Sequence, residues 1–458
     1  MQSQGNVFVQ EKRRRLLPQI SEVDMKKLYP ILVALLAALA ITAGCVPLDE
    51  YGEDSLETSI PISSRTENSG QSSDSQPVEA TEDGAWKELN AEEITREMGL
   101  GWNLGNQLEA SINGVPSETA WGNPIITEDL IKAVKEAGFS TVRIPVSYLQ
   151  KIGSAPDYTI DKAWLDRVQE VVDYVVKNDM YAVINIHGDP YYTVQNSWLL
   201  CVDGNQDEIK SKFRAVWAQI SEQFKDYDEH LIFESMNEVF DNTYGNPNPT
   251  GYENINAYNS IFVDTVRKSG GNNAKRWLII PGWNTNIEYT AGDYGFKIPE
   301  DTDCTASGKR LMISVHYYDP YNFTLDENAG TATTQWGKYA VSNKDSWGQE
   351  DHADAQMKRL NECFVSAGYP VIIGELGVGD KSHISGTFGE YRRYWYEYIV
   401  HSAHRNGCIP VIWDNGWNGN NGLALFDRNT VKVTQPEIIK AVVRAMNSGD
   451  YEIAPPNV

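Results

Sequence analysis

The stretch LIFESMNE, residues 231–238, decides the fold prediction. It begins with a short, mostly apolar run, Leu231–Met236, and ends in Asn237 and Glu238. A run of this length and composition is typical of a buried β-strand. An amphipathic stretch of helical period follows it, over residues 256–268. The segment therefore predicts a strand, a loop that starts with polar side chains, and a helix.

The same unit recurs seven more times between about residue 100 and the C-terminus. The other predicted strands cover residues 100–103, 141–146, 181–187, 277–281, 311–316, 371–375 and 409–413. The other helical patterns cover residues 128–137, 162–177, 209–224, 354–367, 391–404 and 436–446, with a weaker one near 284–291. Eight strands that alternate with helices predict a closed (β/α)8 TIM barrel of the α/β class.

An open, doubly wound sheet is the structural alternative to a barrel. Such sheets usually carry a G-x-G-x-x-G phosphate loop after their first strand. Here the first predicted strand runs into GWNLGN, residues 101–106, which lacks that spacing. The barrel is therefore the favoured interpretation.

Polar and aromatic residues stand where the predicted strands end, which is where TIM barrels gather their catalytic groups. These residues are Arg143, His187, Asn237, Glu238, His316, Tyr318, Glu375 and Trp413. Glu238 and Glu375 end strands that are three positions apart, so they face each other across the barrel mouth. A single glutamate there could form a structural ion pair. Two together favour a catalytic pair, because two carboxyl groups about 5–5.5 Å apart suit double displacement at a sugar's anomeric carbon.

The segments around these residues resemble glycoside hydrolase family 5. The motifs are VRIP (142–145), INIH (184–187), MNE (236–238), SVHYY (314–318), IGE (373–375) and IWDNG (412–416). They occur in the family's order and span residues 99 to 416. GWNLGN (101–106) and TAWGNP (119–124) further resemble the endoglucanase and xyloglucanase branch, subfamily 4.

The resemblance implies a role for each matching residue. Glu238 would be the acid/base and Glu375 the nucleophile, while Asn237 would bind the sugar 2-hydroxyl. The remaining residues implied to bind substrate or to orient Glu375 are Arg143, His187, His316, Tyr318, Trp413, Asn103 and Trp121. At one position the chain departs from many members of the branch: His187 is followed by Gly188 instead of a second histidine.

The chain is rich in aromatic residues, with 13 Trp and 24 Tyr. Pyranose rings pack their C–H faces on aromatic rings, so part of this excess fits a sugar-binding surface. We expect Trp121, Trp198 and Trp417 to provide such faces, and Trp102 and Trp277 to lie in the core.

Residues 1–45 carry the signature of an export signal. An apolar run of sixteen residues, Leu28–Ala43, follows Lys26 and Lys27, and it is shorter than the roughly 20 residues of a membrane span. Met25 is the candidate true start. TAGC, residues 42–45, resembles a bacterial lipobox, which implies lipidation of Cys45, although Thr42 replaces the usual Leu. Ordinary secretion is the alternative.

Residues 46–84 form an acidic, Ser-rich stretch that predicts a disordered linker, and residues 85–458 form the predicted catalytic barrel. The formal net charge of −24 disfavours nucleic-acid binding. No pair of C-x-x-C motifs and no H-E-x-x-H motif exists, so we predict neither a metal nor a cofactor. Four cysteines remain beside Cys45, and three pairings are open. We expect buried thiols at Cys363 and Cys408.

The leading hypothesis is a retaining endo-β-1,4-glucanase that hydrolyses plant β-glucans such as xyloglucan, mixed-linkage glucan and cellulose-type chains. A retaining β-mannanase or another hemicellulase is the alternative. A catalytically inactive, surface glycan-binding lipoprotein is a third hypothesis, and the presence of both glutamates argues against it. We expect an exported monomer at the cell surface that meets the membrane only through its lipid anchor.

Overall fold

The computed structural model describes residues 86–458. The predicted signal segment, Cys45 and the linker therefore lie outside the described residues. Within the described part of the chain, no helix is both long and apolar enough to cross a membrane.

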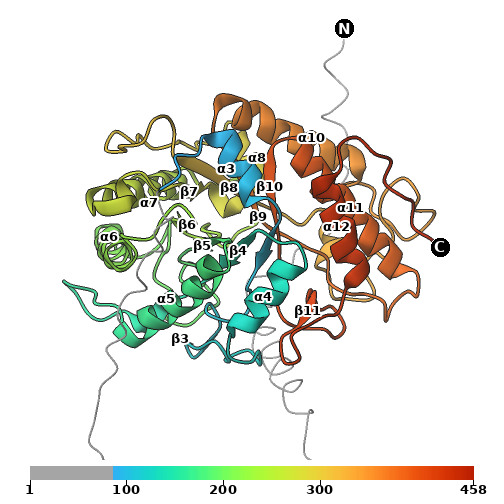
Figure 1. Cartoon of the computed structure of the whole chain (residues 1–458), viewed down its shortest axis with the longest axis horizontal. Coiled ribbons are helices and arrows are strands. Elements are labelled where there is room, and N and C mark those ends of the chain that lie inside the picture. The colour runs from blue at the N-terminus through green and yellow to red at the C-terminus, as the bar shows by residue number, and fades with distance from the viewer. Residues whose placement is uncertain (1–85) are drawn as a thin grey trace, which may run out of the picture. The chain divides into compact units, whose positions relative to one another are not determined.

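Eight parallel strands close into a barrel, which confirms the fold prediction (Figure 1). They lie around the ring in the order β1-β10-β9-β8-β7-β6-β5-β4. Their bounds are β1 (Gly101–Asn103), β4 (Thr141–Ile144), β5 (Tyr181–Ile184), β6 (Leu231–Glu234), β7 (Leu278–Pro281), β8 (Leu311–Tyr317), β9 (Val371–Leu376) and β10 (Cys408–Ile412). Each coincides with a strand predicted from the sequence.

Helices surround the strands and follow each of them along the chain (Figure 1). Their bounds are α4 (Glu128–Glu136), α5 (Lys162–Lys177), α6 (Gln206–Gln223), α7 (Pro249–Lys268), α8 (Ile287–Ala291), α9 (Tyr321–Thr324), α10 (Glu350–Cys363), α11 (Phe388–Arg405) and α12 (Pro436–Asn447). Short 3-10 turns occur at Leu149–Lys151, Gly271–Ala274, Trp283–Thr285 and Val365–Ala367. Two small hairpins, β2 (Ser111–Ile112) with β3 (Val115–Pro116) and β11 (Phe426–Asp427) with β12 (Lys432–Val433), lie in the connections after β1 and β10.

Helix α7 begins at Pro249, seven residues before the start at residue 256 that the spacing of apolar residues predicts. Asn248 caps the helix by accepting the backbone N–H of Gly251 at 3.0 Å, and Pro249 stands in the first turn, where a missing N–H costs nothing. The start of this helix is therefore set by capping and not by its apolar face.

A further helix, α3 (Ala91–Met98), precedes the first strand and was not predicted. Its Asn90 and Glu93 form a reciprocal capping box. Ile94 and Met98 of α3 join an inner apolar cluster with residues from the strands, which are Tyr181, Val183, Ile232, Trp277, Ile279, Met312, Ile372, Ile409 and Val411. The helix thus packs on the filled interior of the barrel, next to the N-terminal ends of the strands.

Candidate active site

The predicted site residues meet at the C-terminal ends of the strands. Asn103 ends β1, Arg143 lies in β4, His316 in β8 and Glu375 in β9. His187, Asn237, Glu238, Tyr318 and Trp413 follow β5, β6, β8 and β10, and Trp121 lies in the connection between β1 and α4. In the pairing of β8 with β9, His316 lies opposite Glu375, just after a shift of register between Val315 and His316. An irregularity of this kind re-aims side chains at the rim of a barrel.

Glu238 and Glu375 lie close to each other, as predicted. A carboxylate oxygen of each and a ring nitrogen of His316 all lie within 4.8 Å of one another. Nδ1 of His316 is 2.7 Å from Oε1 of Glu238 and 3.6 Å from Oε2 of Glu375. Three strands of the barrel thus bring two carboxylates and an imidazole to one point.

Glu375 is fixed from two sides. Nη1 of Arg143 donates to its Oε1 at 3.0 Å, and the hydroxyl of Tyr318 donates to its Oε2 at 2.9 Å. Nε2 of His187 lies 3.9 Å from Oε1. The side chain of Glu375 is 8% exposed, so it can still be reached from outside while its orientation is set by buried neighbours.

Arg143 is fully buried and uses its guanidinium to join four residues. Beside Glu375 it contacts Glu234 (Nε to Oε2, 2.8 Å), Asn103 (Nη1 to Oδ1, 3.0 Å) and Asn237 (Nη2 to Oδ1, 2.7 Å). Because each nitrogen of the fork is engaged, the guanidinium has one orientation. Arg143 therefore positions the groups around the site and has no surface left for a sugar.

Asn103, which the sequence places among the substrate-binding residues, uses both polar atoms of its side chain for contacts within the protein. Its side chain is fully buried, its Nδ2 donates to the carbonyl of Gly374 at 2.8 Å, and its Oδ1 accepts from Arg143. Asn103 ends β1, but its amide faces the barrel interior. It supports Arg143 from below the site.

Glu234, in β6, is a third glutamate of the site and is not among the predicted site residues. Its side chain is fully buried. Its Oε2 accepts from Arg143 and from Nδ2 of Asn185 at 2.8 Å, and its Oε1 accepts from the hydroxyl of Ser314 at 2.7 Å. The signal that could have found it is an acidic residue inside an otherwise apolar strand, since a buried charge requires a partner.

Both oxygens of Glu238 are also engaged. His316 pairs with Oε1, and the hydroxyl of Tyr191 donates to Oε2 at 3.1 Å. Asn237, the preceding residue, donates from Nδ2 to the same hydroxyl at 2.6 Å. Tyr191 lies in the connection after β5, and the sequence pattern does not predict its contact with Glu238.

The pKa values in the site follow from burial and these contacts. Burial raises the pKa of Glu375, although the charges of His316 and Arg143 oppose the rise. Burial acts in the same direction on Glu238, but the hydrogen bond and charge of His316 outweigh it and lower the pKa. Burial and the charge of Arg143 hold the pKa of His187 well below its ordinary value, so that ring is neutral. Burial and the nearby carboxylates keep the pKa of Tyr318 high, so its hydroxyl remains a donor.

The predicted aromatic faces divide into exposed and buried rings. Trp121 is 50% exposed and Trp417 is 62% exposed, and both lie in connections that follow the strands at the mouth. Trp413 is half-buried, with its ring parallel to that of His187 at 5.8 Å. The prediction for Trp198 is wrong. Its ring is only 9% exposed, because its Nε1 donates to buried Asp189 and the ammonium group of Lys212 lies 4.4 Å from its centre.

Trp102 and Trp277 are buried, as predicted. The four described cysteines are all free thiols. Cys408 is buried, as expected, but the expectation for Cys363 is wrong. Its side chain is exposed at the last residue of α10, beyond Leu360, where the buried side of that helix ends.

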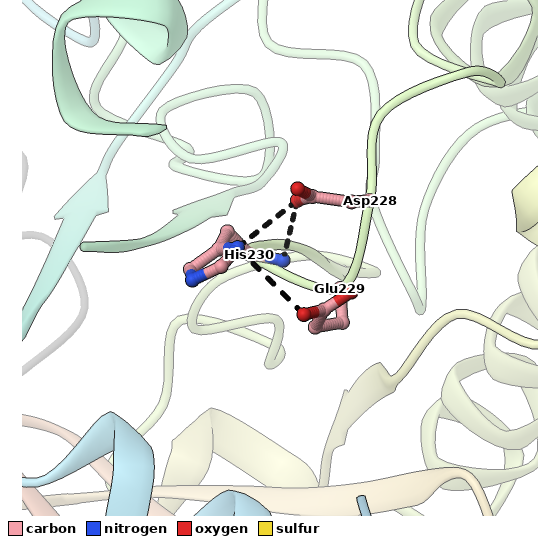
Figure 2. Close-up of side chains that lie close together, drawn as sticks. All are labelled: Asp228, Glu229 and His230. Atoms are coloured by element: carbon pink, nitrogen blue, oxygen red, sulfur yellow. Dashed lines mark hydrogen bonds and ion pairs between the residues drawn. The ribbon is translucent and has the colours of Figure 1, made fainter. Parts of the chain in front are cut away.

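A second group of potential metal ligands lies at the other end of the barrel, just before β6. Asp228, Glu229 and His230 bring one donor atom each within 4.8 Å (Figure 2). Nδ1 of His230 pairs with Asp228 at 3.1 Å, and Oε2 of Glu229 accepts the backbone N–H of Lys87 at 3.0 Å. These atoms already serve contacts within the protein, so we assign no metal to them.

Comparison with known proteins identifies the family. A family model described as cellulase (glycosyl hydrolase family 5) matches residues 105–419. Endoglucanase A of Paenibacillus barcinonensis is 52% identical over 366 residues, which cover 79% of this chain and 91% of the relative. The structure of a family 5 xyloglucanase from Paenibacillus pabuli is similar at a TM-score of 0.76 and 54% identity, over 77% of this chain and 100% of that one.

A GH5-4 broad specificity endoglucanase from Bacteroides salanitronis is similar at a TM-score of 0.74 and 37% identity, over 81% of this chain and 100% of that one. The strand-end residues described above are those on which the sequence resemblance rested, and the family model spans well over half of the chain. The chain belongs to glycosyl hydrolase family 5.

Proposed function

We propose that the protein is a retaining endo-β-1,4-glucanase that hydrolyses β-glucans by double displacement. The observation that carries the mechanism is the approach of Glu238 and Glu375, whose carboxylate oxygens come within 4.8 Å of each other. Inverting enzymes keep their two carboxyl groups roughly 6.5–9.5 Å apart to make room for a water molecule. The closer approach of the two carboxylates here suits direct attack by one of them.

Glu375 is the proposed nucleophile. Arg143 and Tyr318 donate to its two oxygens, which stabilises the carboxylate and aims it. Attack on the anomeric carbon forms a covalent glycosyl-enzyme and breaks the glycosidic bond. Water then releases the sugar, so the configuration is inverted twice and retained overall.

Glu238 is the proposed acid/base. Glu238 and His316 share a hydrogen bond of 2.7 Å, and the proton in it can reside on either residue. The contact with His316 lowers the pKa of Glu238. A bound sugar excludes water, and a dry site favours the neutral pair over the ion pair, which moves the proton to Glu238. Glu238 then protonates the leaving oxygen and later deprotonates the attacking water.

The remaining residues would bind the sugar on either side of the scissile bond. Asn237 would contact the 2-hydroxyl, a hydrogen bond that strengthens as positive charge develops at the anomeric carbon. Trp413 would lie against the sugar beside Glu375, with His187 and His316 lining the same subsite. Trp121 and Trp417 would support sugars further out.

The proposed substrates are neutral β-1,4-linked glucans, including xyloglucan and mixed-linkage glucan. Similar proteins support this class: a Bacteroides ovatus family 5 xyloglucanase, 33% identical, has been solved in complex with a XXXG heptasaccharide. A second similar protein, ZgEngAGH5_4, is 30% identical and has been solved in complex with a cellotriose. A β-mannanase would use the same machinery on another backbone and is the alternative.

Release of reducing ends from xyloglucan, lichenan, carboxymethyl cellulose and mannan tests the proposal. We expect hydrolysis of one or more of the glucans and none of mannan. Glu375→Gln keeps the shape of the side chain, so we expect it to bind these glucans while hydrolysis falls by more than about 10³-fold. Hydrolysis of mannan alone would support the alternative. Binding without hydrolysis by the unaltered protein would support the inactive glycan-binding hypothesis.

We also propose that the protein is an exported monomer, linked to a membrane by a lipid on Cys45. The support is the sequence of residues 1–45, where an apolar run precedes TAGC. Cell fractionation of the full chain and of Cys45→Ala tests the anchor. We expect the altered chain to move from the membrane fraction to the soluble fraction, whereas an unchanged distribution would contradict lipidation at this residue.

A further inference from the structure

Tyr191 touches the acid/base and its neighbour at once. Its hydroxyl accepts a hydrogen bond from Nδ2 of Asn237 at 2.6 Å and donates one to Oε2 of Glu238 at 3.1 Å. The ring is half-buried and meets His187 edge-on, with 6.2 Å between ring centres. Among the described residues of the connection after β5, Tyr191 is the one whose side chain forms a hydrogen bond with Glu238.

These contacts extend a chain of hydrogen bonds that starts at Arg143. Nη2 of Arg143 donates to Oδ1 of Asn237, Nδ2 of Asn237 donates to Tyr191, and Tyr191 donates to Glu238. Every bond in the chain points the same way, from the guanidinium to the carboxylate. Bonds aligned in this manner polarise one another in a buried site. Arg143 therefore acts on Glu375 directly and on Glu238 through two intermediates.

The start of the connection that carries Tyr191 is tightly held. The hydroxyl of Ser147 accepts the backbone N–H of Gly188 at 2.9 Å, and a Cβ atom at Gly188 would lie 2.4 Å from that hydroxyl. The carboxylate of Asp189 accepts the backbone N–H groups of Tyr148 and Leu149 at 2.9 and 2.7 Å. A histidine at position 188 cannot be accommodated without movement of Ser147. The nearest side chain that can reach Glu238 from this connection is Tyr191.

We infer that Tyr191 is a positioning residue for the acid/base, which holds Oε2 of Glu238 so that the carboxyl group meets the leaving oxygen in one orientation. This inference rests on the proposed function, since it assigns a task to Tyr191 only if Glu238 transfers the proton. It has a second consequence. A hydroxyl that donates to Glu238 favours the ionised carboxylate, so loss of the hydroxyl makes Glu238 a weaker acid.

The other ionisable groups near Glu238 come from several strands, and all of them remain in place when the Tyr191 hydroxyl is removed. They are Arg143 from β4, His187 after β5, His316 and Tyr318 from the end of β8, and Glu375 from β9. Any change in the ionisation of Glu238 in such a variant is therefore due to the lost hydrogen bond.

The test compares Tyr191→Phe with Tyr192→Phe. Tyr192 is the matched control because it is adjacent and its hydroxyl has no hydrogen-bond partner among the described residues. The pH dependence of kcat/KM is measured with lichenan and with 2,4-dinitrophenyl β-cellobioside, whose leaving group departs without a proton. Thermal unfolding checks that both variants fold.

For Tyr191→Phe we expect kcat/KM on lichenan to fall about 10-fold, the effect of one hydrogen bond to a charged group. The basic limb of the profile should move to higher pH by up to about one unit, while kcat/KM on the dinitrophenyl substrate stays within about 2-fold of the original. Tyr192→Phe should match the unaltered protein on both substrates.

Two outcomes would overturn the inference. One is a Tyr191→Phe variant that behaves like Tyr192→Phe. The other is an equal loss on both substrates with no shift of the basic limb, which is the signature of a general structural defect. A failure of the proposed function looks different, because the unaltered protein would then hydrolyse neither substrate.

Discussion

Glu234 lies beneath the active site and accepts a hydrogen bond of 2.8 Å from Nε of Arg143. Both side chains are fully buried, so the pair is shielded from solvent. Arg143 thus shares its single positive charge between Glu234 and the proposed nucleophile Glu375, which accepts from its Nη1. The charge of Glu234 therefore sets how strongly Arg143 stabilises the Glu375 carboxylate.

Glu234→Gln should lower the pKa of Glu375, because Arg143 would then face one carboxylate instead of two. The amide can keep its oxygen toward Arg143 and its nitrogen toward Ser314, so the fold should persist. We expect the acidic limb of the kcat/KM profile to move to lower pH, and the rate at the optimum to fall about 10-fold because the nucleophile is over-stabilised. An unmoved acidic limb would contradict this account of the pair.

Retention of configuration follows from the spacing of Glu238 and Glu375. Proton NMR during the first minutes of hydrolysis of a cello-oligosaccharide should show the β-anomer before mutarotation produces the α-anomer. If the α-anomer came first, the two carboxylates would have to act by single displacement.

Glu238→Ala should separate the two steps of the reaction. We expect hydrolysis of glucans to fall by about 10²–10⁴-fold, the usual contribution of a general acid and base. A dinitrophenyl β-cellobioside should still form the glycosyl-enzyme, and added azide should accelerate turnover and yield the β-glycosyl azide. Formation of the β-glycosyl azide by Glu375→Gln instead would show that the two roles are exchanged.

Glu109 makes a pH-dependent contribution to stability. Burial raises its pKa to about 7, even though the backbone N–H groups of Asn106 and Gln107 bind its carboxylate. The folded chain therefore holds this proton more tightly than the unfolded chain, whose Glu titrates near 4.3. The stabilisation is present below about pH 4 and is lost as the pH rises through about 7, by about 4 kcal/mol at most.

Urea unfolding of the unaltered protein and of Glu109→Gln, at pH 5 and at pH 8, measures this pH-dependent contribution to stability. The free energy of unfolding of the unaltered protein, relative to the variant, should be larger at pH 5 than at pH 8. Glu136→Gln, a change at an exposed position of α4, is the control and should show no such difference between the two pH values. A pH-independent effect at Glu109 would contradict the raised pKa.

Trp121 offers an exposed ring at the mouth, held by a hydrogen bond of 3.0 Å from its Nε1 to the carbonyl of Ser111. In the Glu375→Gln background, Trp121→Ala should weaken binding of a long cello-oligosaccharide about 10-fold, since a sugar face on an aromatic ring contributes about 1–2 kcal/mol. Calorimetric titration measures the affinity. An unchanged affinity, with an unchanged melting temperature, would remove Trp121 from the sugar-binding surface.

The fold and the proximity of Glu238 and Glu375 could be predicted because both leave local signals. Each strand is a short apolar run between turns, and Glu238 and Glu375 directly end two of those runs. Helix α3 left only a weak signal, since it is short and mostly polar and its apolar contribution is limited to Ile94 and Met98. The capping pair Asn90 and Glu93 was the one clue to it.

The direction of a side chain at a strand end was not readable from the sequence. Asn103 was placed correctly along the chain but faces inward to Arg143. Trp198 was interpreted as an exposed ring, and its burial depends on Asp189 and Lys212, which no local pattern connects to it. The partners of Glu234 come from three other strands. Such contacts arise only when the barrel closes.

The interior of the barrel is filled by side chains, and α3 packs on it from the side away from the active site. A polymer therefore has no passage through the molecule and must rest across the open end, with both of its tails free in solution. Binding in this way does not require an end of the polysaccharide to enter the site before the glycosidic bond is cleaved. The barrel mouth can therefore bind a long glucan at its middle.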